Sequence, residues 1–263
     1  MNQLFKKLLK AVRLYKPILI IKKEIDRLKS KRNEKLYHKN RIVFYRKLLK
    51  PGNLVFDIGA NIGNRVQVFK ELECNVIAVE PQLNCVKTLK KKFGNSIVIE
   101  QIGLGKQEGI MEMFIADEST ISTFSKEFIE KTKNNKFKRN NWDQKQEVRI
   151  STLDQLITKH GIPEFCKIDV EGFESEVLKG LSKKIPIISF EYNVPEMSEN
   201  VYLCLQLLNN ISEDYLFNFS IGESMAFKLD RWLPYRDFLS LTLTKEFLNS
   251  DFGDIYATIN IKQ

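Results

Sequence analysis

Short apolar runs alternate with segments of helical spacing along most of the chain after Gly52. Nearly continuous apolar runs of this length are typical of parallel strands that are covered on both faces. Five such runs predict strands at residues 54–58, 75–79, 97–100, 165–170 and 186–191. Apolar positions at helical spacing predict helices near residues 63–72, 82–93, 152–159 and 175–182. This alternation of strand and helix predicts an α/β fold with a mostly parallel sheet.

The remaining segments are less regular. Residues 110–116 predict a further strand, and the end of the chain predicts a helix at 197–209 followed by an antiparallel edge. The strands of that edge are expected near residues 215–220, 224–229 and 254–261. Residues 117–147 are strongly polar, with Trp142 isolated among them, and form either a surface excursion or a lid over a site.

The first fifty residues carry the basic character of the chain. They hold 17 Lys and Arg against three acids, a net charge of +14, which leaves −5 for the rest of a chain whose net charge is +9. Residues 3–15 have the spacing of an amphipathic helix, residues 22–48 continue in helical style, and Pro51-Gly52 ends the segment. We therefore expect a basic helical arm at 1–50 and one α/β domain at 51–263.

The arm has three interpretations. It can be a solvated helix packed on the domain, a contact with an anionic membrane surface, or a contact with nucleic acid, which is the least favoured because its aromatic residues form no stacking array. The longest apolar run near the start, residues 17–21, is too short to span a bilayer, and no cleavage site follows it. We expect a cytoplasmic protein, with peripheral membrane attachment through the arm as the alternative.

The cysteine and histidine content limits the chemistry. The four cysteines form no C-x-x-C pair, which indicates a reducing cytoplasm. The chain has only two histidines, His38 and His160, which excludes a His-rich metal site and argues against a His-centred catalytic triad. No resident metal is expected.

A glycine-containing turn follows the first predicted strand of the domain. Gly59 and Gly63 allow the backbone to approach a ligand where any Cβ would intrude. Glu80 ends the second predicted strand, 23 residues after Asp57, which is the distance at which an acid binds a ribose in nucleotide-binding folds. Glycines also serve purely structural turns, so the acid is what indicates a nucleotide site.

Three stretches of the domain resemble the FkbM family of S-adenosylmethionine-dependent methyltransferases. They are Phe56-Asp57-Ile58-Gly59-Ala60-Asn61-Ile62-Gly63, Val79-Glu80-Pro81, and Lys167-Ile168-Asp169-Val170-Glu171-Gly172-Phe173-Glu174, which is similar to that family's most characteristic motif. The resemblance covers roughly residues 50–260 and leaves the arm outside. It implies the class I methyltransferase fold, a Rossmann-like, mostly parallel seven-stranded sheet with one antiparallel strand. It also implies S-adenosyl-L-methionine as the cofactor, bound at the carboxyl ends of the strands.

The resemblance further implies which residues hold the cofactor. Glu80 is expected to accept both ribose hydroxyls, and Asp169 is expected at the junction of cofactor and acceptor. The methionine part is expected against Asp57, Gly59, Ala60, Asn61 and Gly63. The adenine is expected beside Pro81, Gln82, Ile102, Gly103 and Leu104. The turn after the third strand lacks an acid for the adenine amine, so that contact is left to the backbone or is absent.

Asp169, Glu171 and Lys167 are the candidates for catalysis. Methyl transfer needs alignment above all, and a hydroxyl acceptor must also lose a proton, which a carboxylate can take. The two acids can alternatively hold a cation or orient the cofactor amine. Glu171 can equally be a structural cap on the amides around Gly172, and Lys167 can be a buried partner for one of the acids.

These residues favour an O-methyltransferase that acts on a hydroxyl. A sugar in a glycan or glycolipid precursor is the expected acceptor, from the family resemblance alone. The alternatives are an RNA methyltransferase that uses the basic arm and a membrane-recruited scaffold whose cofactor site has decayed. The chain has no Asn-Pro-Pro-Tyr-type motif and no Pro-Cys nucleophile, which argues against methylation of DNA bases. A dinucleotide oxidoreductase is disfavoured because residues 167–174 have no part in hydride transfer.

Overall fold

The computed structural model describes residues 35–259, and the chain divides into two compact units after Arg41. In the first unit the described residues 35–41 are helical, whereas the amphipathic helix expected at 3–15 lies outside the described residues. Across the described part of the chain no helix is both long and apolar enough to cross a membrane.

The second unit begins at Ile42 rather than at Pro51. Phe44, Tyr45 and Leu49 are buried in one of its hydrophobic clusters, so the segment just before the first strand belongs to this unit. Everything described below lies in the second unit.

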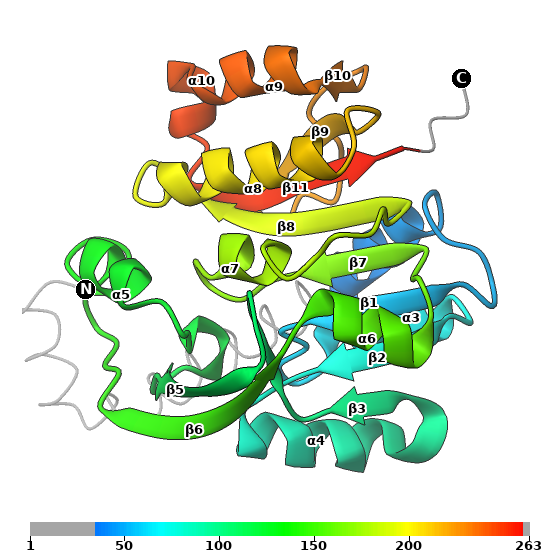
Figure 1. The fold of residues 1–263 in the computed structure, drawn as a ribbon, viewed down its shortest axis with the longest axis vertical. Helices are drawn as coiled ribbons and strands as arrows, with labels where there is room; N and C mark the ends of the chain where they lie inside the picture. The colour runs from blue at the N-terminus through cyan, green and yellow to red at the C-terminus, as the bar shows by residue number, and fades with distance from the viewer. Residues whose placement is uncertain (1–34, 260–263) are drawn as a thin grey trace, which may run out of the picture. The chain divides into compact units, whose positions relative to one another are not determined.

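An eight-stranded sheet organises this unit, with the strand order β10-β9-β11-β8-β7-β1-β2-β3 (Figure 1). The bounds are β1 Leu54–Ile58, β2 Asn75–Val79, β3 Val98–Glu100, β7 Phe165–Ile168, β8 Ile187–Asn193, β9 Leu216–Ile221, β10 Leu233–Pro234 and β11 Phe252–Thr258. Neighbouring strands from β3 to β8 are parallel, and β11 lies antiparallel between β8 and β9. The seven-stranded sheet that the family resemblance implies is therefore present, and the two-residue β10 adds a short antiparallel edge to it.

Helices cover both faces of this sheet. Their bounds are α3 Asn64–Glu71, α4 Leu83–Phe93, α6 Leu153–His160, α7 Glu174–Leu178, α8 Ser198–Ile211, α9 Tyr235–Thr242 and α10 Lys245–Leu248, with a 3₁₀ turn η1 at Gly94–Ser96. Because side chains alternate along a strand, β1 contributes Phe56 to a core with α6 to α10, and Val55 to a core with α3 and α4. Both faces are apolar, which explains the continuous apolar runs in the sequence.

The face covered by α3 becomes polar toward the carboxyl ends of the strands. Along β1, Val55 is followed on this face by Asp57, and along β7, Phe165 is followed by Lys167. Asp57 lies opposite Lys167 in the register, and Lys167 lies opposite Ser189 of β8. All three polar side chains are buried. Ionisable groups are therefore packed inside the protein directly beneath the strand ends.

A separate three-stranded sheet has the order β4-β6-β5. Its strands are β4 Gly103–Leu104, β5 Gly109–Ile115 and β6 Gln144–Ser151, and the 3₁₀ turn η2 Ser119–Ile121 and α5 Lys126–Thr132 lie between β5 and β6. Trp142 is buried with Ile121, Phe128 and Met197 in a small hydrophobic cluster. Its indole Nε1 donates to the Ile121 carbonyl oxygen at 2.8 Å. The polar segment 117–147 thus has a core of its own.

The carboxyl-terminal part differs from the sequence-based expectation, since one expected strand is absent and β10, α9 and α10 were not predicted. The strands expected at 215–220 and 254–261 correspond to β9 and β11, but residues 224–229 form no strand. Met225 has a positive φ of 50°, and the Asn218 side chain accepts from the Leu229 amide at 3.1 Å, so a side chain replaces part of the ladder. The expectation was wrong there because alternating apolar residues also occur in an irregular return loop.

Candidate active site

The glycine turn after β1 lies directly against the motif that follows β7. Gly59 has a φ of +82°, and a Cβ at this position would lie 1.9 Å from the carbonyl oxygen of Asp169. Gly63 has a φ of +84°, and a Cβ there would lie 2.5 Å from the ring of Phe93. Both positions therefore require glycine. The turn is the point at which two motifs from distant parts of the sequence meet.

The carboxylate of Glu80 is buried and fixed by two backbone amides. Oε2 accepts from the Asn61 amide at 2.8 Å, and Oε1 accepts from the Gln82 amide at 2.7 Å. Burial raises the pKa of Glu80 to about 7, although these hydrogen bonds act in the opposite direction. Each carboxylate oxygen has a second acceptor site. Glu80 can therefore hold the turn and still accept hydrogen bonds from the hydroxyls of a ribose.

A pocket of about 210 Å³ opens at the carboxyl ends of the strands. Ten of the residues singled out in the sequence line it: Gly59, Asn61, Glu80, Pro81, Gln82, Ile102, Gly103, Leu104, Asp169 and Glu171. Four do not line it: Asp57, Ala60, Gly63 and Lys167. Burial raises the pKa of Asp57 to about 6, and its Oδ2 has no hydrogen-bond partner among the described residues. Its contact with a cofactor stays a prediction.

The pocket also contains residues that the sequence analysis did not assign to cofactor binding or catalysis. They are Ser119, Thr120, Ser122, Phe124, Phe173, Glu191 and Glu223, among others. Ser119 is tied to the glycine turn, because its Oγ donates to Asn61 Oδ1 at 3.2 Å and its carbonyl oxygen accepts from Gln82 Nε2 at 3.0 Å. The start of segment 117–147 therefore forms a wall of the pocket.

The turn after β7 depends on two left-handed residues and one buried acid. Glu171 has a φ of 55° and Gly172 a φ of 82°. The Oε1 of Glu174 accepts from the amides of Val170 at 3.1 Å and Gly172 at 3.2 Å, and its Oε2 accepts from Asn200 Nδ2 at 2.6 Å. The carboxylate that caps these amides is thus Glu174 rather than Glu171. Glu171 is left to line the pocket.

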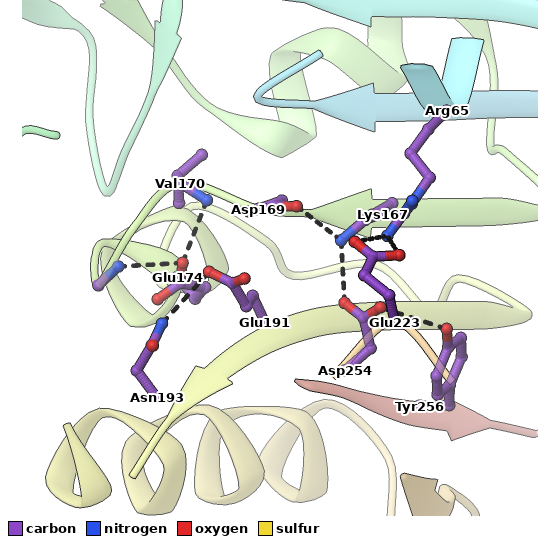
Figure 2. A network of polar contacts seen from close by, with 11 residues as sticks. Arg65, Lys167, Asp169, Val170, Glu174, Glu191, Asn193, Glu223, Asp254 and Tyr256 are labelled. Atoms are coloured by element: carbon purple, nitrogen blue, oxygen red, sulfur yellow. Dashed lines mark hydrogen bonds and ion pairs between the residues drawn. The ribbon is translucent and has the colours of Figure 1, made fainter. Parts of the chain in front are cut away.

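Lys167 lies between the carboxylates of Asp169 and Asp254 (Figure 2). Its Nζ is 2.9 Å from Asp169 Oδ2 and 2.9 Å from Asp254 Oδ1. Burial disfavours the charged ammonium, but the two carboxylates outweigh it and hold the pKa of Lys167 well above its ordinary value. The two carboxylates therefore favour the charged form of Lys167, which in turn holds Asp169 by an ion pair. The expectation that it is a buried partner for one of the acids is confirmed.

A second ion pair ties a distant loop to the helix that follows the glycine turn. Arg65, in the first turn of α3, donates from Nη2 to both carboxylate oxygens of Glu223 at 3.0 Å (Figure 2). Glu223 follows β9 and also lines the pocket. The loop after β9 is therefore fixed at the pocket by a charge-assisted contact.

Three carboxylates converge inside the pocket. Oxygen atoms of Asp169, Glu171 and Glu191 all lie within 4.8 Å of one another. Burial and the neighbouring acids raise the pKa of Glu171 and of Glu191 well above the ordinary value. Carboxylate oxygens are ligands for hard divalent cations, and they are also proton acceptors. Either use is within the chemistry of this cluster.

The strand order, the antiparallel β11, the glycine turn after β1 and the buried acid after β2 are those of the class I methyltransferase fold. A family model described as the Methyltransferase FkbM domain matches residues 57–239. The chain belongs to this family. S-adenosylmethionine fits the residues present, because the pocket is lined by anionic groups that suit a cationic ligand and Glu80 keeps free acceptor sites for hydroxyls.

Solved structures resemble the chain at low identity. A precorrin-6y C5,15-methyltransferase from Geobacter metallireducens is 10% identical, with a TM-score of 0.44, and the match covers 84% of this chain and 86% of that one. A TehB-like S-adenosylmethionine-dependent methyltransferase from Corynebacterium glutamicum is 8% identical, with a TM-score of 0.42 and coverages of 83% and 86%. The plantazolicin methyltransferase BpumL, with S-adenosylhomocysteine bound, is 11% identical, with a TM-score of 0.40 and coverages of 98% and 94%. No curated protein matches the chain in sequence.

Proposed function

We propose that this methyltransferase transfers the methyl group to a hydroxyl, and that the hydroxyl belongs to a sugar of a glycan or glycolipid precursor. The observation that supports an oxygen acceptor is the carboxylate cluster of Asp169, Glu171 and Glu191 inside the pocket. A hydroxyl must lose its proton as the new O–C bond forms, and carboxylates are side chains that can receive it. The sugar itself is supported by the family resemblance alone.

The residues of the cluster have different environments, which suggests different roles. Asp169 is paired with the cationic Lys167, so the charge of its carboxylate is already compensated. Glu171 and Glu191 have no such cation at salt-bridge distance among the described residues, and burial raises their pKa. A raised pKa makes a carboxylate a stronger base, so the Glu171–Glu191 pair is the better proton acceptor. S-adenosylmethionine supplies the methyl group on a cationic sulfur.

The acceptor class is tested with methyl-labelled S-adenosylmethionine and a cell extract separated into neutral glycans, glycolipids, RNA and protein. We expect the label in a base-stable ether linkage of the glycan or glycolipid fraction. Label that enters only RNA would instead support the nucleic-acid alternative. Cofactor binding in calorimetry without transfer to any fraction would favour the scaffold.

The proton-accepting role is tested with the double variant Glu171→Gln/Glu191→Gln. General-base catalysis is typically worth about 10²–10⁴ in rate, so we expect a loss of this size, with cofactor affinity little changed. In the wild type the rate should rise with pH as the pair loses its proton, above the pH at which an ordinary carboxyl titrates. The double variant should lose this rise. The exposed Glu108→Gln is the control, and a pH profile that survives in the double variant would assign the base elsewhere.

A further inference from the structure

A second cavity, of about 540 Å³, lies next to the cofactor pocket. Its walls come from β5, α5, α7 and the start of α8. Phe124 and Phe173 line both cavities, and their ring centroids are 5.5 Å apart. The partition between the cavities is therefore this aromatic pair. We call the second cavity the outer groove.

The outer groove also adjoins the carboxylate cluster along the chain. Glu171 lines the pocket, and the next residue, Gly172, lines the outer groove. A further hollow of about 300 Å³ shares Met111, Phe173 and Glu176 with the outer groove. The surface beside the reaction centre is thus an extended trough, which suits a ligand larger than one hydroxyl-bearing group.

The floor of the outer groove is apolar and partly open to solvent. Met111 is 37% exposed and Leu203 is 43% exposed, whereas Met197 beneath them is buried. Exposed apolar side chains that gather in a concave site are typical of a binding surface. A ligand with an apolar face would remove this surface from water.

The rim of the outer groove is rich in hydrogen-bond acceptors. Glu112, Glu127, Glu176 and Glu199 line it, and Lys126 is the one cation among the described residues that do so. Each of these acids has a lysine partner outside the lining, but exposed ion pairs of this kind contribute little. The carboxylates are therefore available to hydroxyl donors at small cost.

The apolar floor and the acidic rim of the outer groove together favour one class of ligand over others. An acyl chain would take four carboxylates out of water without offering them a donor. A nucleic-acid backbone would find little positive charge to bind, because Lys126 is the one cation among the described lining residues and the lysines beside the four acids are already paired with them. A neutral saccharide has C–H faces for the apolar floor and hydroxyl donors for the acidic rim. We propose that the outer groove binds the saccharide body of the acceptor, whose reacting hydroxyl reaches the pocket past Phe124 and Phe173. This proposal rests on the proposed function and gives its acceptor a binding site.

The test places a charge on the groove floor at two exposed positions of the full-length protein, Met111→Glu and Leu203→Glu. The matched control is Ile110→Glu, since Ile110 is 74% exposed on the same strand as Met111 but does not line the outer groove. Calorimetric titration with S-adenosylmethionine checks folding and cofactor binding. Transfer is measured with methyl-labelled cofactor and the same fractionated extract.

We expect all three variants to bind the cofactor within about twofold of wild type. Labelling of the glycan or glycolipid fraction should fall at least about tenfold in both groove variants, a change of about 1.4 kcal/mol, and should stay within about twofold in Ile110→Glu. Wild-type labelling of glycans that the groove variants leave unchanged would overturn the groove assignment alone. If the wild type labels no glycan, the proposed function fails as well. Labelling of RNA that is lost in the groove variants would assign the outer groove to nucleic acid and overturn the proposal.

Discussion

The cofactor side and the acceptor side of the pocket differ in how their carboxylates are paired. On the cofactor side, the carboxylate of Glu80 is satisfied by the amides of Asn61 and Gln82, and Asn61 is bonded in turn to Ser119. On the acceptor side, Asp169, Glu171 and Glu191 crowd together, and only Asp169 has a cation at salt-bridge distance among the described residues. On the cofactor side the carboxylate already has hydrogen-bond partners. On the acceptor side two of the three carboxylates have no paired cation among the described residues.

Under the proposed function, this difference assigns cofactor binding to one side of the pocket and proton transfer to the other. A prearranged surface binds without reorganisation, which keeps the entropic cost of binding low. A carboxylate crowded by other acids is a stronger base than a solvated one. Gly59 lies against the Asp169 carbonyl, so the two sides of the pocket are in direct contact. A substitution on one side can therefore be tested for its effect on the other.

Substitution at that contact should have the largest effect. Gly59→Ala forces a left-handed conformation, which costs about 1–3 kcal/mol, and pushes a Cβ against a backbone oxygen, which adds about 1–3 kcal/mol. We expect the free energy of unfolding, measured in urea, to fall by about 2–6 kcal/mol. Gly52→Ala is the control, because Gly52 has the same φ of +82° and a Cβ added there would meet nothing within 4 Å. Equal losses in the two variants would mean that the two sides of the pocket are not in contact.

The second-largest effect on the free energy of unfolding is expected at the turn after β7, which supports the acceptor side. Glu174→Ala leaves the amides of Val170 and Gly172 without their acceptor and is expected to cost about 2–3 kcal/mol of unfolding free energy. Glu176→Ala, two residues away, removes only a half-exposed ion pair with Lys179 and should cost less than about 0.5 kcal/mol. Methyl transfer should fall with Glu174→Ala more than cofactor affinity does. An unchanged transfer rate would show that the turn after β7 does not need its cap.

Substitution of Glu80 on the cofactor side should have the smallest effect. Its effect on cofactor affinity should depend on pH. Glu80→Gln keeps the shape of the side chain but removes its charge and the acceptor of one of the two backbone amides, so we expect cofactor affinity at pH 8 to fall about tenfold. In the wild type, affinity should weaken as the pH falls from 8 to 6, because Glu80, with a pKa of about 7, becomes protonated and loses acceptor capacity. The variant should show less of this dependence in calorimetry. Identical pH profiles would remove Glu80 from ribose binding.

Most strands of the main sheet could be predicted from the sequence because the apolar pattern of neighbouring residues determines them. Continuous apolar runs identified the strands that are covered on both faces, and the position of Glu80 at a strand end identified a pocket residue. Strand β6 was missed because its residues are mostly polar and pair only with the short β4 and with β5. Residues 224–229 were assigned to a strand although Asn218 replaces the ladder there.

The acceptor side was harder to predict because its causes are not local. Glu191 lies on a predicted strand, but only the pairing of β8 with β7 brings it beside Asp169. Glu171 and Glu174 are both acids of one motif, and the sequence does not say which caps the turn and which faces the pocket. Asp254 pairs with Lys167 from the far end of the chain. Such partners follow from sheet order and not from spacing.

The small hydrophobic cluster around Trp142 has a consequence for how this protein can diversify. Ile121 and Phe128 belong to the segment that bounds the two cavities, yet they are anchored with Trp142 and Met197 and not in the cores of the main sheet. Ser119 and Phe124 of this segment contact the glycine turn and the main core, but residues 126–142 lie beyond both. Sequence change within residues 126–142 can therefore remodel that boundary while those two contacts are kept, so the acceptor side can diversify in one exchangeable segment.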